Sequence, residues 1–370
     1  MYRLARNTVV IAGIVLSLLS EASAQSTAAR PEKTGKQLYE AACSACHGTN
    51  GKGRPVTTVG FTLPLPDFTN CSFASREPDE DWLAIIHSGG PARGFDRMMP
   101  AFRDALSNAE RRRVLDHVRT FCADDRWPRG ELNLPRPLVT EKAYPEDEAV
   151  LTVDASVEGP ASSNYKLVYE RRIGARNQLE LAVPFSILEQ TPGQRAGGIG
   201  DIALGFKRDL FHSFSKGSIF SAAGEITLPT GDKNKELGSG TTIFETFVAY
   251  GQILPRSSFL QFQGGLELPA DRTRPDEAFW RTAVGKSYLR GGYGRSWSPM
   301  VELVAARELA ASEKTHWDLV PQLQVSLSRR QHVLFSAGVR FPLNDARVRT
   351  TQIMLYVLWD WFDGGLFSGW

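Results

Sequence analysis

The strongest constraint on the fold is an alternation of apolar and polar residues that fills the last part of the chain. Val333, Phe335, Ala337, Val339 and Phe341 occupy every second position of one segment, and most residues between them are small or polar. Side chains of a β-strand point alternately to opposite faces, so a period of two predicts strands with one apolar and one polar face. About twelve such segments follow one another, each of about ten residues, the length that a tilted strand needs to cross a bilayer. We expect strands to begin near Ala149, Tyr165, Gln178, Gly198, Gly217, Thr241, Ser257, Ala278, Ser296, His316, Gln331 and Val348.

The connections between these segments alternate between short and long. Residues 174–176 and 255–256 form tight turns, whereas residues 229–240 and 269–277 form longer loops. Outer-membrane barrels have short periplasmic turns and longer loops on the outer side. A soluble β-sandwich is the alternative, and it explains the alternation but not the strand length or the asymmetry of the loops. The pattern therefore predicts an antiparallel β-barrel over residues 148–370, with both of its ends in the periplasm.

A different pattern lies near the start of the chain. Residues 43–47 read Cys-x-x-Cys-His, which is an attachment sequence for c-type haem. Thiols at this spacing can form thioether bonds to one haem, and the adjacent His47 then reaches the iron as an axial ligand. A thioredoxin-like redox pair or half of a zinc site would need a strand-to-helix junction or a second ligand pair. Neither context surrounds Cys43 and Cys46, so the sequence predicts one covalent haem c.

The flanks of the attachment sequence extend this interpretation. Residues 34–42 have helical spacing and lead directly into Cys43, and the whole stretch of residues 30–123 resembles class I c-type cytochromes. The resemblance implies a small all-α cytochrome c domain over residues 25–123. Three glycines after His47 would let the backbone pass close to the haem edge. They are Gly48, Gly51 and Gly53.

Class I cytochromes pack an N-terminal helix against a C-terminal helix. Here Ser107 and Glu110 form a capping box that opens the second of these helices, and it runs to about Phe121. The resemblance implies that the two helices meet around Gly35, Tyr39 and Phe121.

The resemblance also implies the second axial ligand. The family uses a Met that precedes a Pro, on a loop between the last two helices, and Met99 followed by Pro100 matches this pattern. Met98 is the neighbouring alternative, and His87, in a segment with helical spacing, is the other. A thioether ligand raises the reduction potential relative to a second His. An iron with six ligands favours electron transfer over oxygen chemistry.

Family members also use a proline carbonyl to accept the N–H of the proximal histidine, which fixes the ring. Pro55, Pro64 and Pro66 all follow His47. The sequence does not select among them.

Two cysteines remain after the haem attachment. All four cysteines of the chain lie between residues 43 and 122, and an even leftover pair in an oxidising compartment predicts a disulfide. Cys71 and Cys122 would form it, and two buried free thiols are the alternative.

The first residues predict export. Arg3 and Arg6 precede an apolar run over residues 9–19, and small residues follow up to Ala24. That order is typical of a signal peptide, here residues 1–24. The net charge of +2 argues against a nucleic-acid partner.

Residues 124–147 are rich in proline and charge, which predicts a semi-rigid linker between the two domains. Beyond this linker, residues 198–232 resemble a family of outer-membrane transporters and phenol-degradation accessory proteins. The layout also resembles porin–cytochrome fusions that oxidise extracellular iron, although those proteins carry larger barrels. Several polar residues face inward and are interpreted as lumen ion pairs, with pore lining as the alternative. They are Lys207, Glu225, Glu267, Lys286, Glu302 and Arg340.

These features together favour an electron carrier over an enzyme. We expect a single-haem cytochrome at the periplasmic mouth of a small outer-membrane barrel, with periplasmic redox proteins and membrane lipid as partners. In the alternative, the barrel transports a small molecule and the haem domain acts as a plug or redox gate. A third hypothesis makes the barrel only an anchor.

Overall fold

The computed structural model describes residues 32–60, 64–159, 161–345 and 349–360. The predicted signal peptide and Val348, the expected start of the last strand, lie outside these residues. Within them, no helix is both long and apolar enough to cross a membrane. The N-terminal part is helical. Its elements are α2 (Gly35–Ala42), α3 (Ser44–His47), α4 (Val56–Val59), α5 (Cys71–Ala74), α6 (Asp79–Ser88), the 3-10 turn η1 (Gly90–Arg93), α7 (Asn108–Arg119) and the 3-10 turn η2 (Gly130–Leu132).

The expected contact between the first and last helices is confirmed. A Cβ added to Gly35 would lie 2.0 Å from the carbonyl oxygen of Arg113 on α7, so only glycine lets the two backbones come so close. The rings of Tyr39 and Phe121 lie 5.3 Å apart. The capping box is also present, since the Ser107 hydroxyl accepts from the backbone N–H of Glu110 and the Glu110 carboxylate accepts in return.

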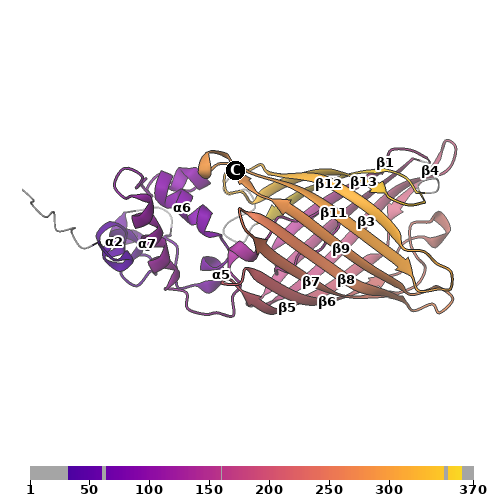
Figure 1. The fold of residues 1–370 in the computed structure, drawn as a ribbon, viewed down its shortest axis with the longest axis horizontal. Coiled ribbons are helices and arrows are strands. Elements are labelled where there is room, and N and C mark those ends of the chain that lie inside the picture. The colour runs from indigo at the N-terminus through magenta and orange to yellow at the C-terminus, as the bar shows by residue number, and fades with distance from the viewer. Residues whose placement is uncertain (1–31, 61–63, 160, 346–348, 361–370) are drawn as a thin grey trace, which may run out of the picture. The chain divides into compact units, whose positions relative to one another are not determined.

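The remainder of the chain forms a closed antiparallel barrel (Figure 1). Twelve strands follow one another around the ring, and the last pairs with the first over the register from Glu148↔Asp360 to Ser156↔Gln352. The ring strands are β1 (Glu148–Ser156), β2 (Ser162–Ile173), β3 (Asn177–Thr191), β5 (Ile202–Ser213), β6 (Ser218–Leu228), β7 (Ile243–Leu254), β8 (Ser258–Pro269), β9 (Glu277–Lys286), β11 (Ser296–Glu308), β12 (His316–Ser326), β13 (Val333–Pro342) and β14 (Gln352–Asp360). Two short strands, β4 (Gln194–Ile199) and β10 (Tyr288–Leu289), pair antiparallel with β3 and β11 respectively.

The alternation of side chains along each strand follows the predicted period. On β14, Ile353 and Val357 are exposed on the outside, whereas Met354, Tyr356 and Leu358 are buried inside. Large apolar side chains are exposed in the same way on every other ring strand except β6. An outer surface of this kind suits contact with lipid, and the closed ring leaves no unpaired strand edge.

The segment before β1 differs from the predicted linker because it runs inside the barrel. Its backbone is hydrogen-bonded to inward side chains of strands all around the ring, which is only achievable from the interior. Leu138 N–H donates to Gln322 on β12 at 3.0 Å, and Lys207 on β5 donates to the carbonyl of Lys142 at 3.0 Å. Further luminal partners are Ser221 on β6, Gln261 and Gln263 on β8, Glu302 on β11 and Tyr356 on β14. We call residues 132–146 the luminal segment.

Several side chains join the helical part to the short turns of the barrel. His332, in the turn between β12 and β13, lies 2.6 Å from the Glu77 carboxylate, and Gln331 donates to Asp81 at 3.1 Å. The guanidinium of Arg93 donates to the carbonyl of Tyr293, between β10 and β11, at 2.6 Å. These contacts belong to the end of the barrel where β1 begins and β14 ends.

Candidate haem site

The two predicted attachment thiols and the predicted ligand lie on one helical turn. Cys43 follows α2 directly and its N–H donates to the carbonyl of Tyr39 at 2.8 Å, so the chain stays helical into α3. The N–H of His47 in turn donates to the carbonyl of Cys43 at 2.9 Å. Both Cys43 and Cys46 are free thiols. Burial, with a smaller contribution from Cys46, raises the pKa of Cys43 to about 11, so its sulfur remains a neutral thiol at neutral pH.

The surroundings of His47 suit a metal ligand. Its Nδ1 atom is buried and makes no hydrogen bond. Burial lowers the pKa of this imidazole to about 4, so the ring is neutral near pH 7 and keeps a lone pair for a metal. The ring stacks on Phe68 with 4.9 Å between centroids. A buried polar atom without a hydrogen-bond partner lowers the stability of the fold, which a bond to a metal would offset. The two thiols and the imidazole are the groups that hold a haem c.

None of the three prolines considered from the sequence orients His47 in this structure, because Nδ1 has no hydrogen-bond partner. The carbonyl of Pro55 instead accepts from the N–H of Thr58 at 2.9 Å, within the start of α4. The ring of His47 is held by the contact with Phe68, whose own N–H donates to the carbonyl of Gly51 at 2.7 Å.

The glycines after His47 are required by the backbone. Gly51 has φ +74° and Gly53 has φ +75°, values that side-chain-bearing residues rarely adopt. A Cβ on Gly51 would lie 2.7 Å from the Phe121 ring, and one on Gly53 would lie 2.9 Å from the Cβ of Leu65. The loop after the attachment sequence is therefore packed tightly against Phe121, just beyond α7, and against Leu65.

The loop that carries the methionines docks on the end of α6. The N–H of Gly90 donates to the carbonyl of Met99 at 3.0 Å, and a Cβ on Gly89 would lie 2.9 Å from that same oxygen. Met98 is 52% exposed, whereas Met99 is half-buried. His87, the third candidate, makes a 2.7 Å contact between its Nδ1 and the Ser88 hydroxyl. Of the two methionines, Met99 is the one whose main chain is held against the end of α6.

A disulfide joins Cys71, the first residue of α5, to Cys122, just beyond α7. The two Cα atoms lie 5.2 Å apart. The bond closes a loop with a sequence separation of 51 residues and holds the middle of the helical domain to its last helix. A cross-link of this kind restricts the unfolded chain and so stabilises the domain.

The family comparison agrees with this geometry. Residues 30–118 match the model described as cytochrome c oxidase, cbb3-type, subunit III. The N-terminal domain is a c-type cytochrome domain. The chain is thus a fusion of that domain with a closed barrel of twelve antiparallel strands.

Solved outer-membrane barrels are similar to the second part of the chain. An outer membrane channel from Pseudomonas putida F1 has 14% identity and a TM-score of 0.40, covering 61% of this chain and 99% of its own. The KdgM porin has 6% identity and a TM-score of 0.37, covering 58% and 99%. The β domain of the Bordetella autotransporter Brka has 11% identity and a TM-score of 0.38, covering 58% and 98%. No curated protein matches the chain.

The sequence reasoning missed the luminal segment and the residues that hold it. The sequence does contain a pattern that could have predicted it. Polar residues occupy inward positions of the strands, and a segment rich in charged residues, able to pair with them, lies just before β1. Of the inward residues named from the sequence, Lys207 and Glu302 contact this segment. Arg340 pairs with Asp318 on the neighbouring strand at 2.5 Å, as expected for a lumen ion pair.

Proposed function

We propose that this protein is an exported electron carrier with one haem c, anchored in the outer membrane by its barrel. Cys43 and Cys46 would hold the haem covalently, and His47 and Met99 would be the axial ligands of its iron. The observation that carries the proposal is the neutral imidazole of His47, whose buried Nδ1 atom has no hydrogen-bond partner and which directly follows the Cys43–Cys46 pair. When bound, a haem with His and Met ligands supplies reversible one-electron transfer.

The chain's own residues would tune that chemistry. Phe68 stacks on the His47 ring and limits its rotation. The Gly90 N–H fixes the carbonyl of Met99 and so positions the methionine loop. Aromatic and aliphatic side chains around this region exclude water, which favours the less charged oxidation state and further supports a high potential. The buried neighbours are Leu38, Tyr39, Phe68, Leu83, Val114 and Leu115.

A periplasmic position of the cytochrome domain is supported by the turns that it contacts. In outer-membrane barrels the short turns lie on the periplasmic side. Glu77 and Asp81 contact the turn between β12 and β13. A single haem on that side is separated from the outer surface by an apolar band of about 25 Å. We therefore expect donor and acceptor to be periplasmic redox proteins, or a donor that enters the lumen.

The second candidate function is transport, with the haem domain as a gate. It is favoured by a cavity of about 260 Å³ inside the barrel, lined by charged side chains of both signs. Among them are Lys166, Glu180, Lys207, Glu225, Glu245 and Arg281. The luminal segment argues against an open pore, because it fills part of the barrel interior. Single-channel conductance in planar bilayers separates the candidates, since a plugged barrel conducts little and a transporter conducts or binds its solute.

The test of the main proposal combines membrane fractionation with haem staining of denatured protein. We expect stain in the outer-membrane fraction, half-loss of attachment for Cys43→Ala or Cys46→Ala, and no stain for the double variant. Ser44→Ala is the matched control, because Ser44 lies between the two thiols and the hydroxyl that this change removes donates to the Glu40 carbonyl. Stain in the double variant, or wild-type protein in the soluble periplasmic fraction, would contradict the proposal.

A further inference from the structure

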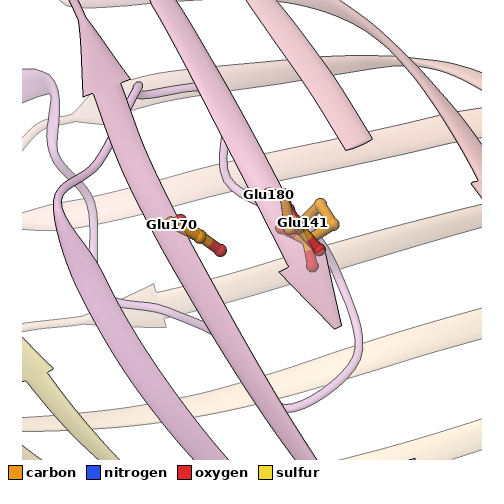
Figure 2. A group of neighbouring side chains, drawn as sticks. All are labelled: Glu141, Glu170 and Glu180. Carbon is orange, nitrogen blue, oxygen red and sulfur yellow. The ribbon is translucent and has the colours of Figure 1, made fainter. Parts of the chain in front are cut away.

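The luminal segment brings a third carboxylate to a pair of carboxylates on the barrel wall. Glu170 on β2 and Glu180 on β3 are direct cross-strand partners, and like charges in that position repel each other. Glu141 reaches them from the luminal segment. One carboxylate oxygen from each of the three residues lies within 4.8 Å of the others. Figure 2 shows the three side chains. We call these three residues the glutamate cluster.

The glutamate cluster is only partly compensated by hydrogen bonds. Arg136 donates to Oε1 of Glu170 at 2.8 Å and lies 3.2 Å from Oε1 of Glu141. The same guanidinium donates to Glu148 at 2.7 Å, so it is shared among three carboxylates. Glu170 is fully buried, yet its Oε2 atom has no hydrogen-bond partner, and neither has Oε2 of Glu141.

The charge around the glutamate cluster is also unbalanced. Lys142 pairs with Glu146 and Glu148, and Lys207 donates to a backbone carbonyl of the luminal segment. Five carboxylates thus face three cations, an excess of two negative charges. The carboxylates are Glu141, Glu146, Glu148, Glu170 and Glu180, and the cations are Arg136, Lys142 and Lys207. The adjoining cavity adds Glu225 and Glu245 and the cations Lys166 and Arg281, which also act on Glu141. Seven carboxylates then face five cations, so the excess of two negative charges remains.

We propose that the glutamate cluster binds a hard divalent cation, with Ca²⁺ as the best fit. Uncompensated buried charge is strongly unfavourable, and a divalent ion supplies the two positive charges that are missing. Oxygen ligands lie about 2.3–2.6 Å from Ca²⁺ and can therefore be as much as about 5 Å apart across it, which includes the spacing observed. All ligand atoms are carboxylate oxygens, which select Ca²⁺ or Mg²⁺ over softer metals.

The proposed cation site has room for further ligands, and a bound ion would link the luminal segment to the barrel wall. Glu141 and Glu180 also line the cavity of about 260 Å³, so water can complete the coordination. Because Glu141 belongs to the luminal segment and the other two ligands to the wall, the ion joins the segment to β2 and β3. The ion thereby holds the luminal segment in place inside the barrel, whether or not the cytochrome domain carries haem.

Isothermal titration calorimetry on the full-length protein in detergent, after removal of metals with EDTA, tests the site with CaCl₂. We expect one Ca²⁺ per chain, with affinity reduced by at least about tenfold in Glu141→Gln and Glu180→Gln. Glu245→Gln is the matched control: it removes a carboxylate from the same cavity outside the glutamate cluster. Glu141 is not on a strand, so its variant keeps the barrel pairing, which heat-modifiable gel migration verifies.

Two results would overturn the site. If wild-type protein binds neither Ca²⁺ nor Mg²⁺, protons on the carboxylates balance the charge instead. If Glu245→Gln weakens Ca²⁺ binding as much as Glu180→Gln, the lumen attracts cations through its total negative charge and not through coordination by the glutamate cluster. Both readouts are independent of haem staining, so failure of the cation site leaves the proposed electron-transfer function intact.

Discussion

Glu302 on β11 binds Thr140 of the luminal segment through two hydrogen bonds to one oxygen. Oε2 of Glu302 accepts from the backbone N–H of Thr140 at 2.7 Å and from its hydroxyl at 2.6 Å. Both residues are almost completely buried. Hydrogen bonds to charged groups contribute about 1.5–3 kcal/mol each, and loss of one partner leaves the other unsatisfied. This pair is therefore a main attachment of the luminal segment to the barrel wall.

Replacement of Glu302 should loosen the luminal segment. In Glu302→Ala we expect the free energy of local opening at Val139 and Thr140 to fall by about 2 kcal/mol, or roughly thirtyfold faster amide hydrogen exchange. The same variant should raise single-channel conductance. Glu308→Ala, at the exposed end of the same strand, is the control and should change neither quantity. Unchanged exchange in Glu302→Ala would show that other contacts hold the segment.

The barrel could be predicted because its strands obey a simple repeat, whereas the luminal segment could not. The alternation of side chains along β14 places Val357 on the outer face and Tyr356 on the inner face, and this holds regardless of what fills the barrel interior. Proline and charge in residues 124–147 indicated a linker, because the sequence alone does not show which charges will be paired. Gln322 and Gln324, at inward positions of β12, show the consequence: both are buried and hydrogen-bonded, to Leu138 and Tyr356 respectively.

Of the candidate haem site, only the residues that are close together in the sequence could be placed in advance. Spacing alone places Cys43, Cys46 and His47 on one turn, since helical geometry over five residues leaves little freedom. The position of Met99 depends on the docking of its loop on Gly89 and Gly90, which no local pattern specifies. The glutamate cluster was invisible from the sequence, because Glu141 meets Glu170 and Glu180 only when the segment enters the barrel.

A charge on the outer face of β14 should impair the barrel. Val357 is 43% exposed on that face, and an arginine at mid-membrane on a lipid-facing position costs about 2–4 kcal/mol. We expect Val357→Arg to reduce the heat-modifiable, folded form in outer-membrane fractions. Ala311→Arg, in the exposed loop between β11 and β12, is the control and should assemble normally. Equal assembly of the two variants would argue against a lipid contact at Val357.

The methionine loop gives a spectroscopic prediction. Met99→Ala should abolish the methionine–iron charge-transfer band and lower the reduction potential, because a thioether ligand raises the potential. Met98→Ala removes the neighbouring, 52% exposed methionine and should leave both measurements unchanged. His87→Ala should also leave them unchanged. A band that persists in Met99→Ala but disappears in Met98→Ala would move the ligand by one residue.

His47 makes the haem-free cytochrome domain sensitive to acid. Without haem, in the Cys43→Ala/Cys46→Ala variant, burial keeps the pKa of His47 at about 4, below its usual 6.5. Between these two values the unfolded chain binds more protons than the folded one, so stability should fall as the pH falls from 6.5 to 4. The loss is at most about 3 kcal/mol. Urea titration followed by helical circular dichroism measures it.

The control for the acid effect is the same variant with His47→Gln added. Other groups titrate in this window, and Asp81, whose pKa burial raises to about 7, acts in the opposite sense because its folded form takes up the proton first. The difference between the two proteins cancels Asp81 and isolates His47. We expect that difference to be constant above pH 7 and to shift against the His47 protein below pH 6.5. Parallel stability curves from pH 7 to pH 4 would mean that water reaches the His47 ring, and they would contradict the lowered pKa of this imidazole.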